Sequence, residues 1–126
     1  MVKERSNGRL VLNQPAGHLE SGETLEQAAR REALEETGWE IQLQGLIGLA
    51  LYHSPHNDTT YHRTTFYGSA QQHFPERELD EGIVDALWMS YEEMLDNREL
   101  MRSDLVLKAV VQYRQGMRYP LDLIYS

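Results

Sequence analysis

Apolar residues alternate with polar ones in some parts of the chain and recur every three or four residues in others. The alternation, together with β-branched and aromatic residues, predicts four strands, at residues 9–14, 39–53, 61–70 and 83–89. The helical period predicts a long helix that begins after Thr24 and ends at Gly38, a short helix after Ser90, and a third from about Ser103 to Gly116.

This order of elements predicts an α/β fold in which a mixed sheet is covered by helices. The 126 residues suffice for one domain, and no repeat or linker divides residues 1–126. The opening strand is short and begins close to Met1, so the pattern leaves one edge of the predicted sheet unprotected.

Composition narrows the classes of partner. Twenty acidic and twelve basic residues give a net charge of −8, which argues against a nucleic-acid polymer. The absence of cysteine excludes disulfides and fits the cytoplasm, and no apolar run is long enough to span a membrane. A phosphorylated small molecule fits this charge if a divalent cation accompanies it. We expect a monomer or a weak dimer.

The long helix places acidic residues where its apolar ones lie. Positions seven apart nearly eclipse on a helix, so Glu32 follows Leu25 and Glu36 follows Ala29 along one face, with Glu35 beside them. Carboxylates crowded in this way repel one another, and hard cations such as Mg²⁺ relieve the repulsion. The helix alone leaves open a second interpretation, in which a solvated acidic face is screened by neighbouring arginines.

A wider pattern surrounds these glutamates. Seven residues of fixed identity stand at set spacings within residues 17–39: Gly17, Glu23, Arg31, Glu32, Glu35, Glu36 and Gly38. Two further positions of this pattern are apolar. This pattern resembles the signature of the Nudix hydrolase family. The resemblance implies a sandwich of a mixed sheet between helices, and the hydrolysis of phosphoanhydride bonds by attack of water on phosphorus.

Roles for individual residues follow from the same resemblance. It implies that Glu32, Glu35 and Glu36 bind Mg²⁺, which Mn²⁺ can replace, and that the backbone carbonyl of Gly17 lies close to the metal. Glu23 and Arg31 are expected to support these ligands, since Arg31 lies one turn before Glu35 and can hold its carboxylate. A plainer role for both, as a link between loop and helix, stays open.

Two further stretches resemble the NudJ phosphatase branch of the family: NQPAGHLE at 13–20 and RSDLVLKAVVQYRQGMRYPLDLI at 102–124. The branch implies release of orthophosphate from nucleoside tri- and diphosphates and from pyrophosphate esters of the thiamine pathway. Its members carry a strand and turn ahead of the segment that begins here as MVKERSNGRL, so part of the usual first strand is expected to be missing.

Three more residues are candidates for the site. Arg63, among threonines and aromatics of a predicted strand, is a candidate phosphate ligand, and His18 is a candidate substrate contact. Glu81 is the preferred loop carboxylate for the catalytic base alongside Glu35, with Asp80 and Glu78 as competitors. For each of these, a plain surface or loop role is the alternative. For the whole chain, the alternatives are a nucleotide-binding module without activity and a hydrolase that releases pyrophosphate.

Overall fold

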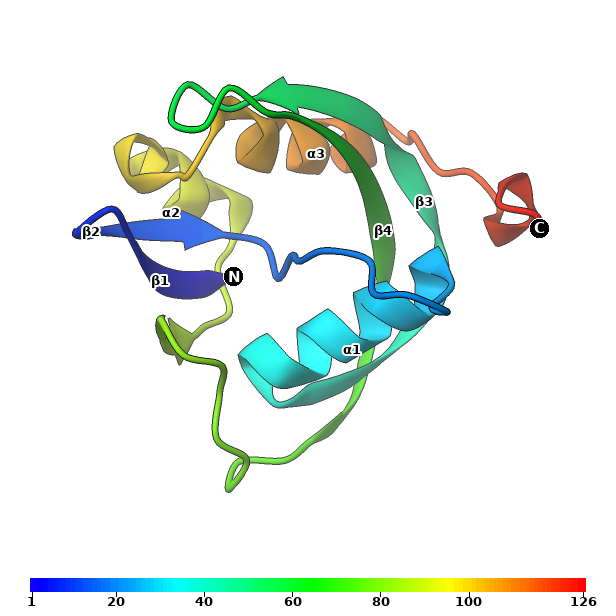
Figure 1. Cartoon of the computed structure of the whole chain (residues 1–126), viewed down its shortest axis with the longest axis horizontal. Helices are drawn as coiled ribbons and strands as arrows, with labels where there is room; N and C mark the ends of the chain where they lie inside the picture. The colour runs from blue at the N-terminus through cyan, green and yellow to red at the C-terminus, as the bar shows by residue number, and fades with distance from the viewer.

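The computed structural model describes all 126 residues as an α/β fold with two antiparallel sheets (Figure 1). The strands are β1 (Val2–Ser6), β2 (Arg9–Asn13), β3 (Trp39–His53), β4 (Thr60–His73) and β5 (Ile83–Ala86). The α-helices are α1 (Leu25–Thr37), α2 (Tyr91–Asp96) and α3 (Asp104–Arg114), and single 3-10 turns lie at Arg98–Leu100 and Leu121–Leu123. No helix has the length and apolar character needed to cross a lipid bilayer.

The long β3–β4 hairpin curves round one side of the molecule, and β1 and β2 lie on the other side (Figure 1). Both α1 and α3 contact β3, so the helices pack on this hairpin. The predicted α/β organisation and all three predicted helices are confirmed. The strands form two antiparallel sheets rather than the one mixed sheet that was expected. A single parallel bridge, Leu12 to Met101, adds to the β2 edge.

The first strand is the main difference from the sequence-based assignment. Val2–Ser6 forms β1, which is the central strand of the sheet order β2-β1-β5. Its sequence, VKERS, carries one apolar residue and gives no clear alternation. The adjacent turn was the available signal, because Asn7 and Gly8 both have positive φ, at 51° and 77°, as the tightest hairpin turns require. The free edge of β2 is also covered in part, since the Arg102 amide donates to the Leu12 carbonyl at 2.9 Å.

The buried core is small and draws on every layer. Val2 of β1 and Val106 of α3 are fully buried, and Leu46 and Ile47 of β3 are nearly so, with 4% and 8% of their surface exposed. The N-terminal amino group donates to the Leu87 carbonyl at 2.9 Å, and its burial lowers the pKa of this group. These contacts fix β1 between β2 and β5.

The C-terminal end of α1 depends on a glycine. Gly38 has φ 76°, its amide donates to the Leu34 carbonyl at 2.9 Å, and an added Cβ would lie 3.2 Å from the Phe74 carbonyl oxygen. Gly8 has nearly the same φ, but nothing lies within 4 Å of its added Cβ. The two glycines therefore share a backbone constraint and differ in the space around them.

We expect Gly8→Ala to lower the free energy of unfolding by about 1 kcal/mol, the cost of a left-handed non-glycine residue. Gly38→Ala should lower it by more, because the methyl group also crowds the Phe74 carbonyl. Both substitutions change the unfolded chain in the same way, so the difference between them reports the crowding. Urea denaturation of the two variants measures it, and equal losses would contradict this account.

Candidate metal and phosphate site

Helix α1 is fixed at both ends, and this determines where its glutamates lie. The Thr24 hydroxyl accepts from the Gln27 amide at 3.1 Å, and the Gln27 side chain accepts from the Thr24 amide at 2.9 Å, which completes a capping box. The helix ends at Gly38 in the left-handed conformation. On the face between these ends, Ala28, Ala33 and Glu36 are buried. The acidic residues therefore continue the apolar face, as the helical period predicted.

Glu36 is the most buried of the helix glutamates, with 5% of its surface exposed. Its Oε1 accepts from the Ala16 amide at 3.4 Å, so the loop before α1 lies directly over it. Burial and the neighbouring carboxyl group of Glu32 raise the pKa of Glu36 to about 8. A buried carboxyl group in this environment is a favourable ligand for a cation, whose charge compensates the ionised form.

Gly17 contacts the next acidic residue of this face. A Cβ atom at Gly17 would collide with the carboxylate of Glu32, so only glycine lets the loop backbone approach this closely. The Glu32 side chain is 14% exposed. The loop therefore covers Glu32 and Glu36 with backbone rather than with side chains.

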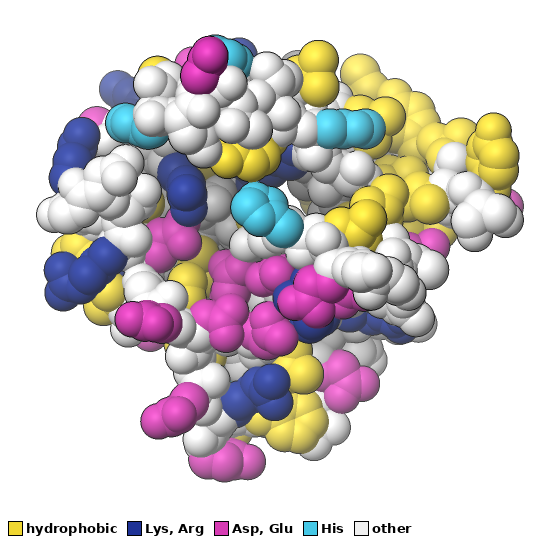
Figure 2. Space-filling model, viewed as in Figure 1, with side chains coloured by type: hydrophobic (Ala, Val, Ile, Leu, Met, Phe, Trp, Pro, Cys, Tyr) yellow, Lys and Arg dark blue, Asp and Glu magenta, His cyan; other side chains and the backbone are white.

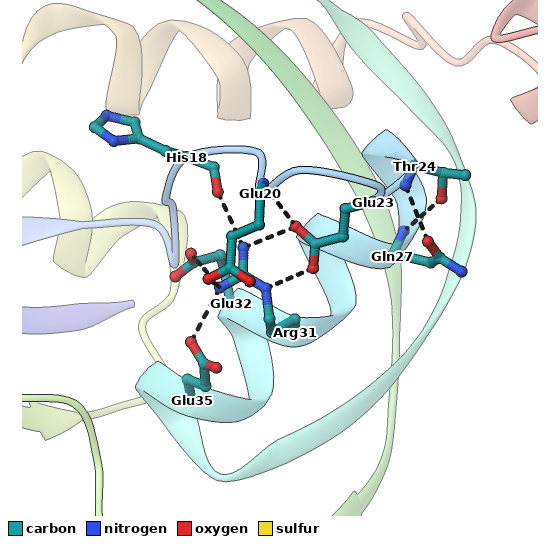
Figure 3. A network of polar contacts seen from close by, with 8 residues as sticks. All are labelled: His18, Glu20, Glu23, Thr24, Gln27, Arg31, Glu32 and Glu35. Carbon is teal, nitrogen blue, oxygen red and sulfur yellow. Dashed lines mark hydrogen bonds and ion pairs between the residues drawn. The ribbon is translucent and has the colours of Figure 1, made fainter. Parts of the chain in front are cut away.

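Arg31 holds the loop and the helix together (Figure 3). Its Nε and Nη2 donate to the two carboxylate oxygens of Glu23 at 2.6 and 3.0 Å, and Nη2 also donates to the His18 carbonyl at 3.0 Å. Its Nη1 donates to Glu32 Oε1 at 2.7 Å and to Glu35 Oε2 at 3.1 Å. Arg31 thus orients two of the expected ligands while Glu23 orients Arg31.

The acidic loop before β5 adds one carboxylate to this group. Oxygens of Glu32, Glu35 and Asp80 lie within 4.8 Å of one another. The Asp80 amide donates to the Glu35 carbonyl at 3.0 Å, and this bond holds the loop against the end of α1. Asp80, one of the two competitors of Glu81, therefore lies with the glutamates of α1, whereas Glu81, the preferred loop residue, is not part of this group. Gly82, at φ 91°, then leads the chain into β5.

The carboxylates form an excess of negative charge. Figure 2 shows Asp and Glu side chains gathered near the middle of one face, with Lys, Arg and His side chains around them. Arg31 pairs with two carboxylates of this acidic cluster, those of Glu32 and Glu35. The cluster has four members: Glu32, Glu35, Glu36 and Asp80. Oxygen ligands with excess negative charge suit a divalent cation of the Mg²⁺ type, so the residues present fit the metal that the fold implies.

Arg63 lies at the other end of the same loop. Its Nη2 donates to Gln14 Oε1 at 2.7 Å and to Asn13 Oδ1 at 3.3 Å, and the Gln14 Nε2 donates to the Val106 carbonyl at 2.7 Å. No carboxylate pairs with this guanidinium. Burial, and then the nearby charge of Arg102, lower the pKa of Arg63. Asn13 and Gln14 were not among the sequence-based candidates, because neutral amides in a loop carry no signal until their partner is known.

The backbone and the ring of His18 contact different parts of the molecule. Its carbonyl faces Arg31, but its ring points away from the carboxylates (Figure 3). The ring lies parallel to Tyr61, with 5.8 Å between centroids and 9° between planes. His18 is thus joined to the acidic cluster through its backbone and to β4 through its side chain.

The Glu23–Arg31 pair should make stability depend on pH. Arg31 lowers the pKa of Glu23 from its ordinary value of 4.5, so the pair stabilises the folded state above pH 4.5. This contribution is lost as the pH falls through the folded-state pKa. We expect Glu23→Gln to lower the melting temperature at pH 7, and to lower it less and less as the pH falls through the folded-state pKa of Glu23. Thermal unfolding of the wild type and the variant over a series of decreasing pH values tests this, and a decrease that is the same at every pH would contradict it.

Comparison with known proteins agrees with this geometry. Residues 1–109 match the NUDIX domain. The chain is 41% identical over 124 residues to proteins named Phosphatase NudJ from Escherichia coli K12 and from Shigella flexneri, a match that covers 98% of this chain and 80% of each relative. It superposes on a NUDIX hydrolase from Nitrosomonas europaea with a TM-score of 0.94 and 42% identity, over 99% of this chain and 85% of that one. The chain therefore belongs to the Nudix hydrolase family and is an enzyme that acts on phosphorus-containing anhydrides.

Proposed function

We propose that the enzyme uses Mg²⁺ to hydrolyse nucleoside tri- and diphosphates and related pyrophosphate esters, such as those of the thiamine pathway, and that it releases orthophosphate. The observation that carries the proposal is the arrangement along residues 13–17. One end of this segment contacts the uncompensated cation Arg63, and the other contacts the acidic cluster. A phosphate chain with a bound divalent cation offers negative charge to Arg63 and positive charge to the acidic cluster. The similarity to proteins named Phosphatase NudJ supports the choice of product.

The metal would be held by the glutamates of α1, with the Gly17 carbonyl beside them. Glu36 and Glu32 lie under the loop, and Glu35 is oriented by Arg31. When bound, Mg²⁺ neutralises phosphate charge and makes a bound water more acidic. Mn²⁺, with a similar preference for oxygen ligands, would replace it.

The chain's own residues supply the remaining functions. Arg63 presents a planar guanidinium to the outer phosphate, where paired N–H groups match two phosphate oxygens. Asp80 and Glu35 are the carboxylates in position to accept the proton of the attacking water. The His18 ring, stacked on Tyr61, offers a flat surface to the base or ring of the substrate. The cytoplasmic location and the monomeric or weakly dimeric state stay predictions from the sequence.

Release of orthophosphate follows if Arg63 and the metal hold the outer two phosphates. Incubation of GTP with the enzyme and Mg²⁺, without added pyrophosphatase, should yield GDP and orthophosphate first and GMP later. Chromatography of the nucleotides with separate phosphate and pyrophosphate assays measures this. Appearance of GMP and pyrophosphate together, without GDP, would show attack at the α-phosphorus and contradict the proposed product.

The same assay compares two variants, a test variant and a control. Glu36→Gln removes a carboxylate that faces the proposed metal, so it should lower turnover by about 10²-fold or more while the fold stays intact. Glu92→Gln changes an exposed acid in the first turn of α2 and should leave turnover unchanged. Near-full activity in Glu36→Gln would contradict the metal assignment.

The two neighbouring loop acids give a matched comparison. Asp80→Asn should lower kcat by about 10²-fold or more if this carboxylate accepts the proton from water. Glu81→Gln should change kcat little, because Glu81 lies outside the group of oxygens within 4.8 Å of one another. Steady-state kinetics of both variants, with melting temperatures to check the fold, make the comparison. A larger loss in Glu81→Gln would reverse the assignment.

A further inference from the structure

Arg63 is held only by neutral groups, which is unusual for a half-buried arginine. Two amide oxygens, from Gln14 and Asn13, accept from its Nη2. The nearby Arg102 differs, because its Nη1 pairs with Glu4 at 2.7 Å. Of these two cations, only Arg63 keeps an unneutralised charge, and desolvated charges require a partner. Arg63 is therefore able to pair with an anion from outside the chain.

The orientation of the Gln14 amide is fixed by its two neighbours. Its Nε2 donates to the Val106 carbonyl at 2.7 Å, which directs Oε1 toward the guanidinium of Arg63 at 2.7 Å. A flipped amide would place NH₂ against the donors of Arg63 and a carbonyl against a carbonyl, so both contacts would become repulsive. Val106 is fully buried in α3. The position of Arg63 is thus tied through the Gln14 side chain to a fully buried residue of the core.

The remaining donors of Arg63 are available to a ligand. A guanidinium has five N–H groups, and the two hydrogens of Nη2 serve the amides. No buried side-chain nitrogen in the structure lacks a partner, so Nε and Nη1, which make no protein hydrogen bond, are reached by solvent. Gln14 also lies two residues before Ala16, whose amide contacts Glu36 of the acidic cluster. An anion at Arg63 would therefore lie on the segment that covers the metal ligands.

We propose that Gln14 is a positioning residue that presents the full charge of Arg63 to the outer phosphate of the substrate. A neutral amide fixes the guanidinium without competing for its charge, whereas a carboxylate at this position would form an ion pair and occupy the cation. Gln14 acts through Arg63 and does not itself contact the phosphorus under attack. This inference rests on the phosphate-binding part of the proposed function.

A double-mutant cycle tests the proposal. Arg63→Ala and Gln14→Ala should each raise KM for GTP, Arg63→Ala by about tenfold or more, the effect of a hydrogen bond to a charged group, with smaller changes in kcat. The double variant should match Arg63→Ala alone, because Gln14 has nothing left to orient. If the effects of Gln14→Ala persist in the Arg63→Ala background, Gln14 acts independently of Arg63 and the proposal is wrong.

Two further variants separate charge from structure. Gln14→Glu should raise KM more than Gln14→Ala, because the new carboxylate pairs with Arg63. Gln112→Ala is the matched control: Gln112 Nε2 also donates to a backbone carbonyl, that of Ile47 at 3.3 Å, but Gln112 contacts no arginine. The control should leave KM unchanged, and equal effects of Gln14→Ala and Gln14→Glu would overturn the charge argument.

A binding measurement distinguishes failure of this inference from failure of the proposed function. Methylenediphosphonate, in which carbon replaces the bridging oxygen of pyrophosphate, is titrated by calorimetry with Mg²⁺ present. The inference is supported if Gln14→Ala weakens binding in the wild-type background and has no effect on binding in the Arg63→Ala background, even if no nucleotide is hydrolysed. Hydrolysis of GTP with unchanged binding in Gln14→Ala overturns the inference and leaves the proposed function intact.

Discussion

Arg31 is the one cation paired with the carboxylates of α1, and the rest of the site depends on how it divides its contacts. It binds both oxygens of Glu23, the His18 carbonyl, Glu32 and Glu35 at the same time. Charge-assisted bonds of this kind fix geometry as well as charge. Yet one guanidinium does not neutralise the carboxylates that surround it, and Glu36 lies outside its reach. Arg31 thus orients members of the acidic cluster but does not neutralise the negative charge of the whole cluster.

The parts of the fold that the sequence predicted are those with local signals. Helix α1 has a capping box at Thr24 and a glycine stop at Gly38, and both are present in the structure. The place of Glu36 on the same face as Ala29 followed from helical geometry alone, because it depends only on the period of the helix. Such features need no knowledge of what the helix packs against.

Features that depend on tertiary neighbours could not be predicted in this way. Strand β1 reads as polar, and its central place comes from pairing with β2 and β5 on its two sides. The choice between Asp80 and Glu81 depends on a backbone hydrogen bond to Glu35 across more than forty residues of chain. The sequence likewise gives no signal for Gln14, because its contacts are with Arg63 and Val106, which belong to other elements.

The short loop of residues 13–17 has a mechanical consequence. Its side chains and backbone contact Arg63, Val106, Glu36 and Glu32, so three elements far apart in the sequence, β4, α3 and α1, meet through five consecutive residues. A displacement of this loop cannot disturb the basic end of the site and leave the acidic end in place. The span of five residues also limits how far the two ends of the site can separate, because the covalent chain cannot stretch beyond its extended length.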